Sequence, residues 1–241
     1  MSRFSILTKC AVSLFAIAGC AEVLSAQQGK AVMPNLTGYW RLQDDSRNVP
    51  SANLTPQAAS VKQAELAKHD VQEIRWCHWY GVPYLMETSP LQLAQSRNGY
   101  EIDIIFNTRN PSRHIYLDRP HPNAETLDAT SDGNSVGKWD GETLVVDTIA
   151  FSEEGLTAIP GGGRRTKESH LVERFRLLRN GAQLSVVSTW TDPTVFSEPH
   201  TYEFRYFRIP DKDFEIPNID CDPADEARTK FLSNPPGTQI H

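Results

Sequence analysis

Three dipeptides that end in glycine constrain the fold more than any other feature of this chain. Asn98-Gly99, Asp140-Gly141 and Asn180-Gly181 each lie between runs in which apolar and polar residues alternate. Such dipeptides are typical of the tight turns that join antiparallel strands, because their residues tolerate positive φ angles. The sequence therefore predicts several β-hairpins and a mainly β fold.

The alternating runs predict about nine short strands. They cover residues 36–42, 91–97, 100–106, 113–117, 138–139, 143–149, 169–178, 182–190 and 201–209. Because no strand–helix–strand alternation is present, we expect an antiparallel meander that closes into a barrel around one small ligand. A two-sheet sandwich without a cavity is the alternative. The inward face should hold Tyr100, Ile102, Ile104 and Phe106 of one strand and Leu184, Val186, Ser188 and Trp190 of another.

Two helices are predicted outside the strands. Thr55-Pro56 has a capping hydroxyl followed by proline, which favours a long N-terminal helix that ends near Trp76. Its apolar face should contain Val61, Ala64, Ala67, Val71 and Ile74. A short C-terminal helix is expected after Asp222-Pro223.

The N-terminus has the pattern of an export signal over residues 1–26. Arg3 and Lys9 precede an apolar stretch that is too short to span a bilayer. Residues 17–20 resemble a bacterial lipobox, which would leave Cys20 lipid-modified, whereas cleavage after Ala26 is the alternative. We therefore expect a periplasmic or outer-membrane-anchored protein, with residues 36–241 forming one barrel domain.

The remaining cysteines and the charge add two expectations. Cys77 and Cys221 are predicted to form a disulfide in an oxidising compartment, with two free thiols as the alternative. The formal net charge is −6, and loss of Arg3 and Lys9 with the signal makes it about −8. An acidic chain of this kind is not expected to bind nucleic acid.

Two segments resemble known families. Gly38-Tyr39-Trp40 is similar to the Gly-x-Trp mark of lipocalins. Residues 137–148 match Gly-x-Trp-x-Gly-Asp-Thr-Leu-Val-Val-Asp-Thr, which a family of exported bacterial proteins carries, with Glu142 in place of the aspartate. Residues 173–175 and 192–193 match that family's Glu-Arg-Phe and Asp-Pro, and residues 113–118 also resemble its pattern. Most members of this family have no assigned activity.

One departure and one fainter resemblance bear on function. The family often has His-Ser where this chain has Arg165-Thr166, which puts any role of that histidine in doubt, although His170 is nearby. The chain also resembles cofactor-free decarboxylases or lyases that act on lignin-derived phenolic dimers. This resemblance implies a small aromatic acid as the substrate, without a cofactor.

The sequence argues against two common kinds of catalytic site. Gly133-Asn-Ser135-Val-Gly137 matches a hydrolase motif, but the residues that follow predict paired strands rather than the helix that a nucleophile elbow requires. The histidines do not form a His-x-His or His-Glu-x-x-His pattern, so no metal site is predicted from the sequence, and a site assembled from scattered ligands is the alternative.

The pair Glu173-Arg174 is a candidate for buried charge. Neighbouring residues of a strand point to opposite faces, so one of the two should face inward, where it needs a partner. An inward Glu173 would pair with Arg113 or a histidine, and an inward Arg174 with Asp147 or a substrate carboxylate. A purely structural ion pair is the alternative.

The leading functional hypothesis is a cofactor-free lyase or decarboxylase that acts on a small phenolic acid. Its candidate proton-transfer residues are His114, Tyr116, His170, Glu173 and Asp147. Its candidate substrate-binding residues are Arg113, Arg174, Trp139 and Trp190.

The pattern predicts that His114 and Tyr116 share one face and Arg113 the other. Residues 160–165 are predicted to be a solvated hairpin tip, with closure over an anionic ligand as the alternative. The rival function is a non-catalytic, lipocalin-like carrier of a small amphipathic ligand, and a structural envelope lipoprotein with a filled core is the third alternative.

Overall fold

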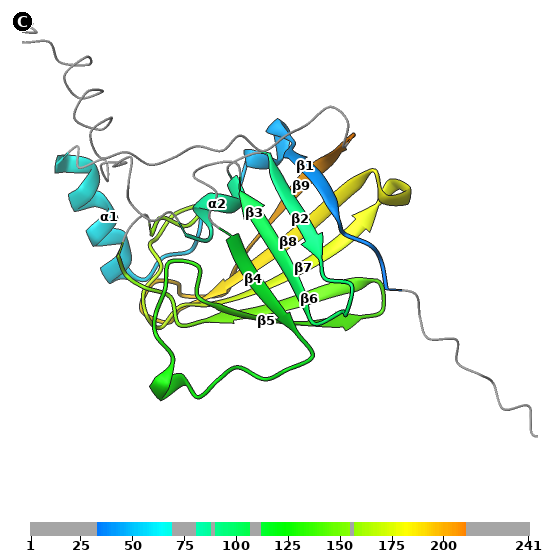
Figure 1. Ribbon diagram of the computed structural model, residues 1–241. Helices are drawn as coiled ribbons and strands as arrows, with labels where there is room; N and C mark the ends of the chain where they lie inside the picture. The colour runs from blue at the N-terminus through cyan, green and yellow to red at the C-terminus, as the bar shows by residue number, and fades with distance from the viewer. Residues whose placement is uncertain (1–32, 69–80, 88–89, 107–111, 155–156, 211–241) are drawn as a thin grey trace, which may run out of the picture. The chain divides into compact units, whose positions relative to one another are not determined.

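Nine strands close into one barrel (Figure 1). The computed structural model describes residues 33–68, 81–87, 90–106, 112–154 and 157–210. Each strand pairs with the next along the chain, and β9 closes the barrel against β1. The strands are β1 Gly38–Leu42, β2 Leu91–Gln95, β3 Glu101–Phe106, β4 Ser112–Leu117, β5 Asn134–Asp140, β6 Thr143–Ile149, β7 His170–Leu178, β8 Gln183–Thr191 and β9 His200–Ile209.

The turns between neighbouring strands confirm the three predicted hairpins. Gly99, Gly141 and Gly181 all have positive φ angles, and Asn180 adopts a left-handed conformation at φ 55°. They connect β2 to β3, β5 to β6 and β7 to β8 with antiparallel registers. Local turn chemistry therefore sets three of the connections between consecutive strands.

The antiparallel expectation is wrong at one position. Strands β4 and β5 run parallel, because the intervening residues 118–133 carry the chain back before β5 begins. Their contact is close at Gly137, where an added Cβ would lie 2.8 Å from Leu117 and 2.9 Å from Ile115. A side chain at this position would displace the buried side chains of Ile115 and Leu117.

The interior of the barrel is packed with large side chains. Ile102, Ile104 and Phe106 are fully buried, as are Leu184, Val186 and Trp190, which confirms most of the predicted inward face. Tyr100 is the exception, with 69% of its surface exposed, because it precedes β3. The inward positions thus form a solid core over these strands rather than the walls of an open vessel.

The long N-terminal helix begins at the predicted residue, but its expected apolar face is not buried at the positions whose side chains the structure describes. Helix α1 spans Pro56–Lys68 and α2 spans Tyr84–Glu87, with short 3-10 turns at Asp44–Arg47, Ala124–Thr126 and Arg179–Gly181. Thr55 Oγ1 accepts a hydrogen bond from the Ala58 N–H at 3.2 Å. Val61 is 49% exposed and Ala64 is also exposed, so the expected apolar face of α1 is not buried there.

Several predictions lie outside the described residues. They are the end of the long helix near Trp76, the C-terminal helix, lipidation of Cys20 and the Cys77–Cys221 disulfide. Among the helices that the structure describes, none combines the length and the apolar character needed to cross a bilayer.

Candidate functional site

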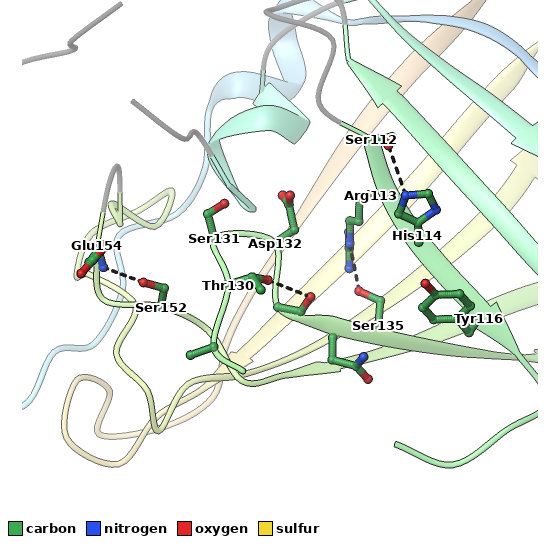
Figure 2. A pocket seen from close by; sticks show the side chains of 13 residues that line it. Ser112, Arg113, His114, Tyr116, Thr130, Ser131, Asp132, Ser135, Ser152 and Glu154 are labelled. Atoms are coloured by element: carbon green, nitrogen blue, oxygen red, sulfur yellow. Dashed lines mark hydrogen bonds between the residues drawn. The ribbon is translucent and has the colours of Figure 1, made fainter. Parts of the chain in front are cut away.

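The parallel pair β4–β5 opens a pocket in the barrel wall. The two strands pair only through residues 115–117 and 135–137. Before this contact, residues 112–114 of β4 face residues 129–134, which lead into β5, across a pocket of about 930 Å³. This volume lies in the range of small-molecule sites. We call this the seam pocket, and Figure 2 shows the side chains that line it.

Arg113 lies at the inner end of the seam pocket and joins three polar side chains in the barrel interior. Its Nε donates to Ser135 Oγ at 3.0 Å and its Nη2 donates to Thr148 Oγ1 at 2.9 Å. Nη2 also pairs with Glu173 Oε2. The four residues come from four successive strands, β4 to β7, and all are buried. We call them the buried polar cluster.

The buried polar cluster confirms the prediction that an inward Glu173 pairs with Arg113. Its neighbour Arg174 faces outward, where its Nη2 lies 3.0 Å from Asp140 Oδ2. Arg174 therefore does not line the seam pocket, where a ligand for a substrate carboxylate would have to lie. Strand alternation separates the two adjacent charges, and the one that faces inward is stabilised by an opposite charge.

Two polar atoms of the buried polar cluster have no hydrogen-bond partner among the residues that the structure describes. Arg113 Nη1 and Glu173 Oε1 are both buried and have no hydrogen-bond partner within the described chain. An unsatisfied polar atom in a protein interior is costly, and such atoms are frequent at functional sites. Arg113 therefore retains a donor that a ligand could use.

Asp132 lies on the opposite wall of the seam pocket from Arg113 (Figure 2). Burial raises the pKa of this carboxyl to about 6, although the positive charges of Arg113 and Arg165 oppose the rise. A backbone hydrogen bond from Val82 also stabilises the carboxylate. Its Oδ1 is buried and has no hydrogen-bond partner among the residues described. Asp132 is thus able to exchange a proton near neutral pH.

Close backbone packing holds Asp132 in place. A Cβ on Gly81 would lie 1.7 Å from the carbonyl oxygen of Ser131, so only glycine permits this approach. The Val82 carbonyl that follows accepts a hydrogen bond from Arg165 Nη1 at 2.6 Å. Arg165 is 1% exposed, and burial lowers its pKa to about 10. The prediction of a solvated tip is therefore wrong for Arg165, which packs inside and supports Asp132.

His114 and Tyr116 share the outer face of β4, as predicted, and both line the rim of the seam pocket. Their rings are stacked with centroids 6.2 Å apart. The guanidinium of Arg119 lies 3.5 Å from the centre of the Tyr116 ring, which extends the rim with a positive charge. The structure therefore brings Arg113, His114 and Tyr116 to one pocket from opposite faces of one strand.

Asp147 and His170 lie elsewhere, on the outer surface of β6 and β7. Asp147 Oδ2 is 2.8 Å from His170 Nε2, and Asp147 Oδ1 is 2.8 Å from His121 Nε2. His121 also contacts Asn134 through its other ring nitrogen. Neither Asp147 nor His170 lines the seam pocket, so the structure does not bring these two residues together with Arg113 and Tyr116.

The two tryptophans do not form walls of the seam pocket either. Trp190 is fully buried in the core, where its Nε1 donates to Tyr202 Oη at 3.1 Å and its ring packs on Phe151. Trp139 lines a separate outer pocket of about 630 Å³, which Asp147 also lines. The structure therefore places Trp190 in the core and Trp139 at an outer pocket, and brings neither to the seam pocket.

Ser135 is a strand residue rather than a nucleophile. It lies in β5, is 1% exposed, and its hydroxyl contacts Thr148 Oγ1 at 3.0 Å in addition to Arg113. No helix follows it, because β6 is the next element. The structure thus confirms the paired strands that were predicted at this motif.

The sequence interpretation missed Asp132 and Arg165. Asp132 precedes Gly133 and has the appearance of an ordinary turn residue, so no local signal distinguishes it. Arg165 did have a signal, because it stands where the resembled family often has histidine. Comparison of the chain with protein-family models found no match, and comparison with curated proteins found no relative.

Proposed function

We propose that the protein is a lyase of the carboxy-lyase type that removes carbon dioxide from a small phenolic acid in the seam pocket. The observation that supports this most is the presence of Arg113 and Asp132 at one pocket. One is a buried cation with an unused donor, and the other is a carboxyl with a pKa of about 6. A cation suits a substrate carboxylate, and an acid of this strength suits proton transfer near neutral pH.

The proposed reaction uses a phenol whose side chain carries a hydroxyl on the carbon next to the ring and a carboxylate on the following carbon. Protonated Asp132 gives its proton to the hydroxyl, which leaves as water, while the phenol releases its proton to solvent and becomes a quinone methide. The bond to the carboxylate carbon then breaks, and its electron pair forms the side-chain double bond as the ring regains a phenolate. Two protons from solvent restore the phenol and Asp132, and carbon dioxide is released. No net oxidation or reduction occurs.

The other residues have supporting roles in this proposal. Arg113 holds the carboxylate in a poorly solvated place, which favours its loss as neutral carbon dioxide. Glu173 fixes Arg113 through the pairing of its Oε2 with the guanidinium. Tyr116 places a ring and a hydroxyl at the rim. The closed barrel and the Gly38-Tyr39-Trp40 strand are consistent with lipocalin-like character, and the N-terminal pattern favours action in the periplasm or at the outer membrane.

Incubation of the purified protein with a panel of phenolic hydroxy acids tests the proposal, with mass spectrometry to follow loss of carbon dioxide and water. Asp132→Asn should lower the rate by about 10²–10⁴-fold, which is typical for loss of a general acid. Arg174→Lys, on the outer surface, is the matched control and should leave the rate unchanged. Because the protonated form acts, the rate should fall as the pH rises through about 6.

Two results would decide against catalysis. Binding without turnover, seen as a raised melting temperature and unchanged ligand mass, would support the rival carrier function. Full activity in Asp132→Asn would show that another residue supplies the proton, and the mechanism above would then be wrong.

A further inference from the structure

A second group of charged side chains lies on the outer face of β3 and β4. Asp103 is directly opposite His114 in the strand register, and Glu101 is two residues away on the same face of β3. One ligand atom from each of the three residues lies within 4.8 Å of the other two. We call Glu101, Asp103 and His114 the outer-face triad. Antiparallel pairing alone brings them together, which explains why no sequence motif reveals them.

In the outer-face triad, one ring nitrogen of His114 lies close to oxygens of two carboxylates. His114 Nδ1 lies 2.9 Å from Glu101 Oε1 and 2.8 Å from Asp103 Oδ1. A ring nitrogen carries at most one hydrogen, so Nδ1 cannot donate a full hydrogen bond to both oxygens. Asp103 Oδ1 is buried, and among the described residues it has no hydrogen-bond partner apart from its contact with this nitrogen. The arrangement therefore has excess negative charge around one nitrogen, and a cation at that position would neutralise both oxygens.

Ser112 orients the imidazole for such a cation. Ser112 Oγ lies 3.2 Å from His114 Nε2, the nitrogen that faces away from the carboxylates. If Nε2 carries the hydrogen and donates it to Ser112, then Nδ1 presents its lone pair toward Glu101 and Asp103. Residues that bind the far nitrogen of a ligand histidine have this role in many metal sites.

We propose that the outer-face triad binds a divalent transition-metal ion, with Zn²⁺ as the representative. One imidazole nitrogen and two carboxylate oxygens form a donor set that zinc accepts, and the remaining positions would be open to water. The imidazole favours Zn²⁺ over Mg²⁺, which prefers oxygen ligands. His114 is 48% exposed, so the ion can reach the site from solvent. The reaction proposed above uses Arg113 and Asp132 but no member of this triad, so either proposal can fail alone.

Isothermal titration of the purified protein with Zn²⁺ tests the site, and the visible spectrum of bound Co²⁺ reports its ligands. His114→Gln and Asp103→Asn should each weaken binding by at least about 100-fold. Ser112→Ala should weaken it by about tenfold, because only the orientation of the ring is lost. His170→Gln is the matched control from the other outer histidine–carboxylate group and should bind Zn²⁺ as the unaltered protein does.

Unfolding curves for each variant show whether the fold is retained, and we expect little change at these exposed positions. Submillimolar Zn²⁺ binding that depends on His114 and Asp103, but not on His170, supports the site. Absence of submillimolar binding would overturn the proposal. Equal binding by the unaltered protein and His114→Gln would also overturn it and would place the ion elsewhere on the chain.

Discussion

Glu173 and Arg174 are neighbours on β7, and each forms an arginine–carboxylate pair in a different environment. The Arg113–Glu173 pair faces inward, with side chains that are 0% and 1% exposed. The Arg174–Asp140 pair faces outward, with side chains that are 50% and 72% exposed. The chemical groups are the same, so the comparison isolates the effect of water on an ion pair.

Removal from water changes what each pair contributes. A buried pair forms at a large desolvation cost, and loss of one partner leaves an uncompensated charge in the core. An exposed pair competes with solvent and contributes little. Single substitutions in the inward pair should therefore lower the free energy of unfolding strongly, whereas those in the outward pair should change it little. The seam pocket opens beside the sensitive pair, where a ligand charge also has the most effect.

The largest expected effect follows from breaking the inward pair. Glu173→Gln keeps the shape of the side chain but leaves Arg113 unpaired, so the free energy of unfolding should fall by about 3–5 kcal/mol. Urea unfolding at neutral pH measures the change. The double variant Arg113→Met, Glu173→Leu should recover most of the loss, because an apolar pair of similar size is tolerated in place of a buried ion pair. A loss below about 1 kcal/mol in Glu173→Gln would show that water reaches the pair.

Asp192 extends the comparison to a buried carboxylate that hydroxyl groups stabilise. Thr166, Ser169 and Thr194 donate their hydroxyl hydrogens to its two oxygens at 2.6–2.7 Å. Burial alone would raise the pKa of Asp192, but these hydrogen bonds outweigh it and lower the pKa below its usual value. Because the pKa is lowered on folding, the stabilisation exists above the unfolded pKa and disappears as the pH falls through the folded one.

Asp192→Asn should therefore destabilise the protein by about 1.5–3 kcal/mol at neutral pH, since hydrogen bonds to a charged group are lost. The difference between the variant and the unaltered protein should shrink as the pH is lowered below about 4. Unfolding curves at a series of pH values measure it, and Asp140→Asn is an exposed control. A difference that does not depend on pH would mean that the charge of Asp192 contributes nothing.

The sequence predicted the fold well because local signals dominate it. Dipeptides such as Asn98-Gly99 fix the hairpins, and alternation fixes which residues face inward. The parallel pairing of β4 and β5 was not predictable in this way, since it depends on the path of residues 118–133 and on close contact at Gly137. The seam pocket exists because of that pairing, so its position was also beyond local pattern reading.

The candidate site was predicted only in part for the same reason. Strand parity and the need of a buried charge for a partner were enough to pair Glu173 with Arg113. Asp132 acquires its raised pKa from burial, which depends on close packing of the distant Gly81 against Ser131. A property that arises from such long-range burial has no counterpart in the neighbouring sequence.

Asp132→Asn should change the free energy of unfolding less than Asp192→Asn does, and in the opposite direction. Its pKa is raised to about 6 in the fold, so ionisation above that pH destabilises the native state. The stability is fully present below the unfolded pKa of about 4 and falls as the pH rises through about 6. Asp132→Asn should therefore stabilise the protein by about 1 kcal/mol at pH values near 8, after allowance for solvent screening, and have no effect near pH 4. Thermal unfolding at the two pH values measures the change, and destabilisation at the higher pH would contradict the burial of this carboxyl.

The smallest effect is expected for the outward pair. Arg174→Gln should change the free energy of unfolding by about 0.2–1 kcal/mol, because both groups remain largely in water when paired. Added salt should reduce even this difference, since exposed charges are screened over about 10 Å at ordinary ionic strength. The double-mutant cycle with Asp140→Asn isolates the interaction from other effects of each substitution. A coupling as large as that of Arg113 and Glu173 would mean that strand geometry, rather than exclusion of water, sets the strength of both pairs.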